Sequence, residues 1–193
     1  MKPVERGELL SLAAYEQIRD RFRARIIELK RARRVPLGPN MTALFENRDT
    51  VLFQIQEMLR TERITAPSQV QHELDTYNAL VPADDELSVT VFIEYPEREE
   101  RERMLQALAG VETSFYVSID GERAGGIGPK RGDREDRATA LHYLKFPLGR
   151  AQRDAVSRGA AALALGVEHP AYSAESALGP ASVASLRDDY SGG

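Results

Sequence analysis

The stretch LSVTVFIEY, residues 87–95, decides the fold, because the apolar residues change there from helical spacing to strict alternation. One face of this stretch is apolar throughout: Leu87, Val89, Val91, Ile93 and Tyr95. A period of two residues is typical of a β-strand with one buried face. The segments before it repeat at steps of three and four residues, whereas those after it mix both periods. The sequence therefore predicts an α+β fold, with helices first and a sheet after.

Three helices are predicted upstream of this strand, at residues 11–34, 42–63 and 67–80. In each of them, apolar side chains recur at three- and four-residue steps and form a stripe along one side. Residues 36–39 and Pro82 end the first and third helices, because proline lacks the backbone N–H and glycine permits a turn. The second helix carries two adjacent apolar rows, which predicts burial on more than one side.

Two helices and three more strands are predicted downstream. The helices span residues 97–109 and 150–158, and the strands span 113–119, 138–148 and 161–168. The resulting order, strand–helix–strand–strand–helix–strand, is typical of a ferredoxin-like βαββαβ unit. We therefore expect three N-terminal helices packed with a four-stranded antiparallel ferredoxin-like sheet. An antiparallel sheet with a different strand order is the alternative.

The expected division of the chain places a helical section at residues 1–82. A ferredoxin-like α/β section with a short C-terminal tail follows at residues 83–193. The tail is rich in Ala, Ser and Gly, so we expect at most one more short helix there, near residues 182–189. A chain of 193 residues is long enough to bury a core of its own, and we expect one compact unit.

The composition excludes several classes of site. The chain contains no cysteine, which rules out disulfides, thiolate metal sites, iron–sulfur ligation by this chain and a cysteine nucleophile. Its first residues, MKPVERGELL, carry charges where a signal peptide needs an apolar stretch. No segment approaches the roughly 18 uninterrupted apolar residues that a membrane-spanning helix needs. We therefore expect a cytoplasmic protein that does not enter a membrane.

Charge is spread unevenly along the chain, although its net value is only −4. Residues 1–35 hold ten Lys and Arg against five Asp and Glu. This excess belongs to one helix of an acidic protein, whereas a nucleic-acid-binding protein is usually basic over a whole face. Pairing with acidic residues of the same chain or of another subunit is the simpler interpretation. We therefore do not expect nucleic acid as a partner. Nucleic-acid binding through this basic first helix is kept as a second alternative, behind the two functional hypotheses given below.

The stretch FENRDT, residues 45–50, places consecutive polar residues inside a strongly apolar predicted helix. Buried charges are costly unless they are paired and hydrogen-bonded, so these side chains either form an ion-pair network or line a polar cavity. The network is favoured, with Glu73 and Asp75 of the third helix as expected partners of Arg48. In the cavity interpretation, Arg48 holds an anionic or polar ligand and Asp49 or Glu57 acts as base. The candidate residues for either role are Glu46, Arg48, Asp49, Glu57, Glu73 and His142.

No motif of high specificity accompanies this cluster. The three histidines, His72, His142 and His169, show none of the local spacings of di-iron or zinc helices, so we expect no metal and no cofactor. A metal site assembled over long range from His142, His169 and carboxylates is left open. The glycine-rich loop at residues 125–132 lacks the complete dinucleotide and Walker patterns. Its basic residues offer contacts to an anion, yet a surface hairpin tip is the favoured interpretation: Lys130, Arg131 and Arg134.

Several segments together resemble a known family. They are LFENRDTVLFQIQEMLRTERI, ELDTYNALVP, DELSVTVFIEY, LHYLKFPL and VEHPAY. Over residues 8–172 the chain looks like a member of an uncharacterised bacterial family, domain of unknown function 3501. The resemblance implies no established activity. Members tend to be encoded near rubrerythrin-like and iron–sulfur proteins, which implies a role beside peroxide or electron-transfer chemistry.

Two functional hypotheses from different classes follow, and whether the chain is an enzyme stays open. In the first, favoured here, the chain is a non-catalytic accessory or binding protein in a rubrerythrin and iron–sulfur redox-stress system, with a redox protein as partner. We expect it to self-associate as a homo-oligomer, most simply a dimer. In the second, it is an enzyme or ligand binder for a small anionic or polar molecule held in a helix–sheet cleft.

Overall fold

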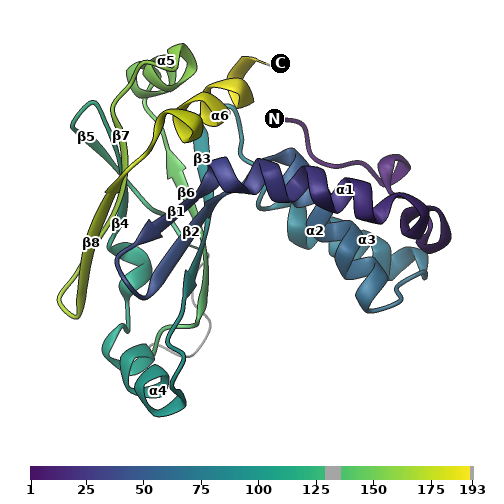
Figure 1. Cartoon of the computed structure of the whole chain (residues 1–193), viewed down its shortest axis with the longest axis horizontal. Coiled ribbons are helices and arrows are strands. Elements are labelled where there is room, and N and C mark those ends of the chain that lie inside the picture. Colours follow the sequence, from purple (N-terminus) through teal and green to yellow (C-terminus); the bar gives the residue numbers. More distant parts are fainter. Residues whose placement is uncertain (129–135, 192–193) are drawn as a thin grey trace.

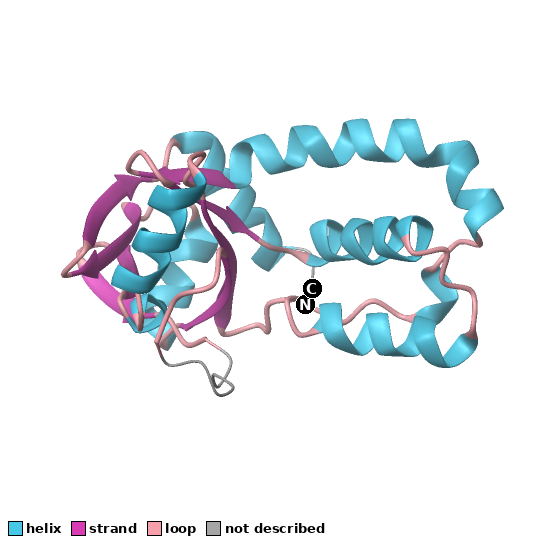
Figure 2. Ribbon diagram, turned by 90° about the horizontal axis from the view of Figure 1, so that it is seen from below, coloured by secondary structure: helices cyan, strands magenta, loops and turns pink. Residues whose placement is uncertain are grey.

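A helical arm projects from one side of a two-sheet β-structure in the computed structural model, which describes residues 1–128 and 136–191 (Figure 1). Figure 2 shows the strands gathered at one end, the arm at the other, and the N-terminus where the two meet. The α+β class predicted from the sequence is confirmed. No helix within the described ranges combines the length and the apolar character that crossing a membrane requires.

The arm consists of helices α1 (Leu12–Arg33), α2 (Arg48–Thr61) and α3 (Pro67–Asn78). The Ser11 hydroxyl caps the start of α1, where it accepts a hydrogen bond from the Ala14 N–H. The N-terminal segment, α2, α3 and the residues after α3 share a small apolar core, against which Leu12 of α1 packs: Val4, Val51, Ile55, Leu59, Leu74, Leu80 and Val81. This core is separate from that of the sheets and holds the arm together.

The strands form two antiparallel sheets of four strands each. Sheet A has the order β1 (Arg34–Leu37), β2 (Met41–Phe45), β3 (Glu86–Ile93), β6 (Leu141–Pro147). Sheet B has the order β5 (Glu122–Gly125), β4 (Phe115–Ile119), β7 (Leu163–His169), β8 (Tyr172–Ala177). Their inward side chains, such as Phe45, Val91, Phe115 and Leu165, belong to one large buried cluster.

The edges of the two sheets are tied to each other. On one side, Ile127 and Lys145 exchange backbone hydrogen bonds of 2.7 and 2.9 Å between N and O. On the other side, the Tyr172 hydroxyl donates to the Leu37 carbonyl at 2.5 Å, and the Ser176 hydroxyl donates to the Pro36 carbonyl. These contacts give partners to backbone groups that open sheet edges leave exposed.

Three further helices lie around the sheets: α4 (Arg98–Ala107), α5 (Arg150–Arg158) and α6 (Pro180–Ser191). Two short 3₁₀ helices complete the described structure, η1 (Arg6–Glu8) and η2 (Val111–Thr113). In Figure 1, α5 and α6 lie together at the end of the sheets nearest the arm junction, and α4 lies at the opposite end.

The ferredoxin-like arrangement predicted from the sequence is not what the chain forms. The four strands predicted downstream of residue 83 divide between the sheets, with β3 paired to β6 and β4 paired to β7. Each pair then gains strands that the sequence pattern did not show. The β1–β2 hairpin extends sheet A, while β5 and β8 flank sheet B. Two sheets packed face to face bury the face that a single ferredoxin-like sheet leaves for the helices.

The predicted second helix also begins later than expected. Residues 42–45 belong to β2, and α2 begins only at Arg48. A short continuous apolar run such as MTALF is compatible with either a buried strand or a buried helix, so its periodicity alone does not separate the two. The polar residues of FENRDT therefore lie at a strand-to-helix connection and not in the middle of a helix.

Candidate functional site

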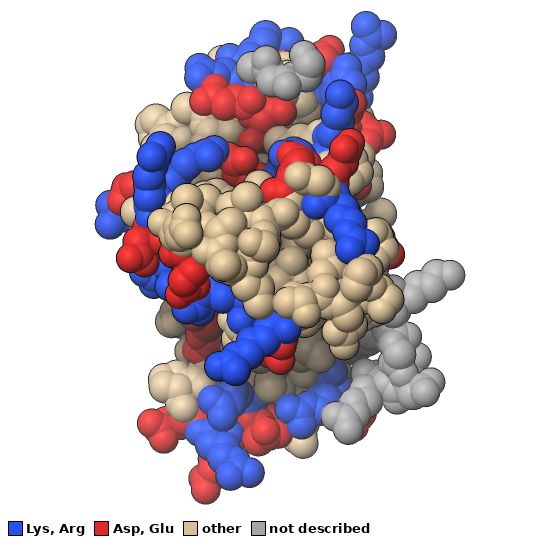
Figure 3. Space-filling view, turned by 90° about the vertical axis from the view of Figure 1, so that its right-hand side faces the viewer, with Lys and Arg blue, Asp and Glu red and all other residues tan. Residues whose placement is uncertain are grey.

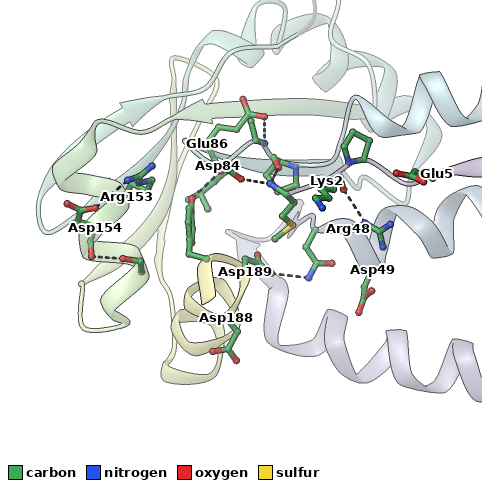
Figure 4. Close-up of a pocket in the computed structure, with 18 of the residues that line it drawn as sticks. Lys2, Glu5, Arg48, Asp49, Asp84, Glu86, Arg153, Asp154, Asp188 and Asp189 are labelled. Atoms are coloured by element: carbon green, nitrogen blue, oxygen red, sulfur yellow. Dashed lines mark hydrogen bonds and ion pairs between the residues drawn. The ribbon is translucent and has the colours of Figure 1, made fainter. Parts of the chain in front are cut away.

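A groove of about 1230 Å³ lies where the arm meets the sheets (Figure 4). Its walls come from the N-terminal segment, the start of α2, the loop before β3, and one face each of α5 and α6. Arg48 and Asp49 lie at one end, Arg153 and Asp154 at the other, and Asp189 lies between them (Figure 4). Residues far apart in the sequence therefore meet in one surface feature.

The groove is rich in carboxylates. Its acidic residues are Glu5, Glu8, Asp49, Asp84, Glu86, Asp154, Asp188 and Asp189, and its Lys and Arg residues are Lys2, Arg48 and Arg153. Several of these acids already contact a cation: Asp84 contacts the Met1 amine at 2.7 Å and Glu86 contacts Lys145 at 2.7 Å. Asp84 and Asp188 still expose 88% and 64% of their side chains, so their carboxylates face solvent.

Arg48 and Asp49 form the first turn of α2, which explains why charged residues stand next to an apolar helix. Arg48 Nε donates to the Lys2 carbonyl at 3.1 Å, and its guanidinium pairs with Glu8. The hydrogen bond between the Arg48 guanidinium and Glu8 is the main cause that lowers the pKa of the Glu8 carboxyl. Asp49 pairs with Arg25 of α1. Both side chains keep about a third of their surface exposed, so neither is a buried charge.

A fully buried arginine lies beneath the groove. Arg33, at the end of α1, is 1% exposed, and its guanidinium contacts both oxygens of Asp189 at 2.6 and 3.1 Å. It also donates to the carbonyls of Phe45 (2.8 Å) and Glu46 (3.0 Å), and to the carbonyl and hydroxyl of Ser185. Arg33 thus joins the arm, sheet A and α6 at one point.

Asp189 is the acidic partner in this network. Burial raises the pKa of its carboxyl, and the contact with Arg33 opposes that rise. The side-chain amide of Asn47, the cap of α2, donates to the same carboxylate at 3.1 Å. The groove therefore has a rigid floor in which each polar group has a defined partner.

Glu46 is buried between β2, α2 and β3. Its two carboxylate oxygens accept hydrogen bonds from the hydroxyls of Thr50 and Thr90, the latter at 2.7 Å. The nearby ammonium of Lys30 lies over the ring of Phe53, 5.6 Å from its centroid. Burial lowers the pKa of Lys30, while the charge of Glu46 raises it. Both oxygens of the buried Glu46 carboxylate therefore have hydrogen-bond partners within the fold.

Glu57 joins α2 to α1 and lies away from the groove. Its carboxylate accepts the Tyr15 hydroxyl at 2.7 Å and two bonds from Arg19 at 2.8 and 2.9 Å. The Arg19 hydrogen bond holds the pKa of Glu57 below its usual value of 4.5, although partial burial opposes this. Burial and the same carboxylate raise the pKa of Tyr15.

Because its pKa is lowered by folding, Glu57 stabilises the native state above pH 4.5, and that contribution is lost as the pH falls through the folded-state pKa. We expect Glu57→Gln to lower the free energy of unfolding by about 1.5–3 kcal/mol near neutral pH, as for hydrogen bonds to charged groups. The gap between variant and wild type narrows as the pH falls below 4.5. Urea unfolding at a series of pH values measures both.

The matched control for this prediction is Glu16→Gln, which removes the exposed Glu16–Arg60 pair between the same two helices. Its effect is expected to stay within about 1 kcal/mol, because exposed ion pairs contribute little. A Glu57→Gln deficit that is the same at all pH values would contradict the assignment of the lowered pKa to this contact.

The remaining predicted residues do not join the groove. Glu73 is half-buried on α3, and Asp75, its expected companion, accepts from Gln71 instead of Arg48. His142 is buried on β6 opposite Val91, on the strand face that also carries Leu144 and Phe146. Lys130, Arg131 and Arg134 lie outside the described residues. Within the parts of the chain that the structure describes, no three His, Asp or Glu residues lie together in a way that would hold a metal ion.

Much of the basic first helix is paired within the chain. Arg19, Arg25 and Arg33 contact carboxylates of other helices, and Arg31 contacts Glu28 on the same helix. Figure 3, which looks at the end of the arm, shows basic and acidic side chains interspersed around an uncharged central area. Glu102, in the acidic helix α4, pairs with Arg137. Pairing within the chain thus accounts for part of the basic excess.

Sequence reasoning missed most of the groove. Arg33 has the spacing of the buried stripe, seven residues after Ile26, so its position on the inner face was readable. The acidic run Asp84–Glu86 directly precedes the central strand. Asp188 and Asp189 lie in a tail whose Ala, Ser and Gly content suggested little structure, and no local signal links them to residue 33.

A model of the protein family of unknown function DUF3501 matches residues 3–190. The chain is also similar to a novel protein of unknown function from Burkholderia pseudomallei K96243, known from a crystal structure at 1.90 Å resolution. The two are 34% identical, and the match covers 97% of this chain and 99% of that chain with a TM-score of 0.91. None of the curated proteins matches. Neither match carries an established function, and the chain belongs to the DUF3501 family, as its resemblance to that family predicted.

Proposed function

We propose that the protein is a non-catalytic accessory protein whose groove binds a segment of a partner protein. The observation that carries this proposal is the groove itself, about 1230 Å³ in volume. Small-molecule pockets are typically about 300–1000 Å³. A wider surface lined by charged side chains from five chain segments suits a polypeptide better than a small ligand.

The charge of the groove favours a basic segment. Eight carboxylates line it against three Lys and Arg side chains. Most of these carboxylates already contact a cation, but the side chains of Asp84 and Asp188 remain 88% and 64% exposed. Complementary charge directs partners to such a surface and excludes those of like sign. Arg48, the expected holder of an anion, already pairs with Glu8 and the Lys2 carbonyl. An anionic small molecule, the alternative hypothesis, is therefore disfavoured at this place.

The candidate charges have structural partners, which supports a binding role. Glu46 is held by two threonines, Glu57 by Tyr15 and Arg19, and Asp49 by Arg25. The contacts of Glu57 and Asp49 hold α1 and α2 together, and those of Glu46 hold the start of α2 on β3. Their carboxylates are not directed together at one point where a reacting atom would sit.

The expected partner is a redox protein of the rubrerythrin or iron–sulfur kind, as the family resemblance implies. Self-association as a dimer and a cytoplasmic location remain part of the proposal. Co-purification with such redox proteins, lost when groove carboxylates are neutralised, would support it.

A direct test uses a fluorescent oligo-arginine peptide as probe at about 0.15 M salt. In the variant Asp154→Asn/Asp188→Asn, two exposed carboxylates at the α5–α6 side of the groove are neutralised. We expect the affinity for the probe to fall by about two- to thirtyfold, because two exposed ion pairs at about 0.2–1 kcal/mol each are lost. Fluorescence anisotropy measures the dissociation constants.

The control variant Glu99→Gln/Glu100→Gln removes two carboxylates from α4, at the far end of the sheets (Figure 1). It changes the net charge equally and should leave the affinity within about twofold of wild type. Equal losses in both variants would mean diffuse attraction to an acidic protein and would overturn the groove assignment. If a polyamine binds as tightly as the peptide, the result would favour a small cationic ligand over a polypeptide segment.

A further inference from the structure

The N-terminal segment, residues 1–10, lies along the arm as an extended strap with one 3₁₀ turn at Arg6–Glu8. It contacts α2 and α3, which are far from it in sequence, and its first residues form one wall of the groove. In Figure 4, Lys2 and Glu5 mark its course past Arg48. The strap is therefore a peptide seated on a helical face.

Two side-chain amides hold this strap by its backbone. The Asn78 amide accepts from the Val4 N–H at 2.8 Å and donates to the Val4 carbonyl at 3.0 Å. The Gln56 amide does the same for Leu10, accepting at 3.0 Å and donating at 3.1 Å. Each amide completes both hydrogen bonds of one residue, as a neighbouring β-strand would. At these two points the amides bind the backbone N–H and carbonyl of the strap, so these hydrogen bonds do not depend on which side chains the strap carries there.

Between the two amides the face is selective. Val4 is 3% exposed and packs into the apolar core of the arm, together with Val51, Ile55 and Leu74. Arg48 adds contacts to the Lys2 carbonyl and the Glu8 carboxylate. With the strap in place, Gln56 is only 2% exposed, so its amide faces the strap and not solvent.

We propose that this face of α2 and α3 is a binding site for an extended peptide, occupied here by the chain's own strap. The ligand class is a polypeptide segment with a β-branched apolar residue at the Val4 position, held by backbone hydrogen bonds to Asn78 and Gln56. Because the strap walls the groove, a partner segment that replaces it gains access to both surfaces. In this respect the inference rests on the proposed function and specifies how the partner is held.

The test compares binding of a labelled peptide with the sequence of residues 1–10 to the full chain and to its Val4→Asp variant. A charge at a buried apolar position expels the tethered strap, and the vacated site then takes the free peptide. We expect the peptide to bind the variant at least about tenfold more tightly than wild type, where the tethered strap competes at an effective concentration near millimolar. A peptide carrying the same Val4→Asp change should not bind.

Three controls separate this site from the groove. Gln56→Ala/Asn78→Ala in the Val4→Asp chain should abolish peptide binding. Asp154→Asn/Asp188→Asn, whose residues do not touch the strap, should leave it unchanged, so either proposal can fail without the other. Equal binding of the two peptides, or none to the Val4→Asp chain, would overturn the inference.

If the Val4→Asp variant does not fold, hydrogen exchange of the wild-type chain tests instead whether the strap can leave its site. The amides of Val4 and Leu10 should exchange at least about tenfold faster than those of β3, through local release of the strap. Asn78→Ala should accelerate exchange at Val4 and leave β3 unaffected. Exchange of strap and β3 at one common rate would show that the strap leaves only on global unfolding, and would exclude a replaceable occupant.

Discussion

Replacing Arg33 by Met should lower the free energy of unfolding by about 3–5 kcal/mol, which is typical when one partner of a buried ion pair is removed. Met keeps most of the volume but leaves the buried Asp189 carboxylate without its cation. It also leaves the carbonyls of Phe45 and Glu46 without their Arg33 donors. Urea denaturation followed by circular dichroism measures the change.

Two further variants test whether the loss of stability comes from the buried ion pair. Arg31→Met, on the same helix, removes a side chain that is 72% exposed, and its effect should stay within about 1 kcal/mol. In Arg33→Met/Asp189→Leu, both charges are gone, and much of the lost stability should return, because apolar pairs often replace buried ion pairs at little cost. A double variant less stable than Arg33→Met would show that the network around Asn47 and Ser185, and not the charge pair, carries the effect.

The local elements were largely readable from the sequence. The predicted helix at residues 11–34 is α1, that at 150–158 is α5, and the strand at 87–95 contains most of β3. These segments carry strong periodicity over many residues together with capping or breaking residues at their ends. Where the hydrophobic periodicity and the capping or breaking residues indicate the same element, the local structure can be predicted from the sequence.

The sheet arrangement was not readable in the same way. The tail strand β8 has the pattern YSAESA, whose small residues give little apolar alternation. It is fixed by long-range contacts, since it pairs with β7 and its Tyr172 hydroxyl reaches Leu37. Pairing partners so distant in sequence leave no local signal, and the division into two sheets depends on them.

The candidate site shows the same limit. Arg48 and Asp49 were found because charge beside an apolar helix is a local anomaly. Asp84 and Asp189 are ordinary acids in the sequence and become part of a groove only when the arm, the loop before β3 and α6 meet. Arg33 was counted among the charges of a basic helix, yet its inward position makes it the most buried of them.

Gly166→Ala should destabilise the protein by about 1–3 kcal/mol, the usual cost of overpacking. Gly166 lies in β7 beside Tyr116 of β4, and a Cβ added there would stand 2.3 Å from the tyrosine Cζ. Two contacts oppose a shift of the ring. Its hydroxyl donates to Glu175 at 2.8 Å, and the Arg123 guanidinium stacks 3.8 Å from its centre. Chemical denaturation measures the loss.

The sign of this effect should reverse when the ring is absent. In a Tyr116→Ala chain the three closest atoms to the added methyl are removed, and Gly166→Ala should then stabilise by about 0.5–1 kcal/mol, since glycine costs that much relative to alanine within a strand. Gly125→Ala supplies the matched control, because Gly125 flanks Tyr116 on β5 but a Cβ there meets nothing within 4 Å. That variant should be neutral or stabilising with the ring present. If Gly166→Ala lowers the free energy of unfolding equally with and without Tyr116, the backbone of β7 requires the glycine. Contact with the Tyr116 ring would then not be the cause.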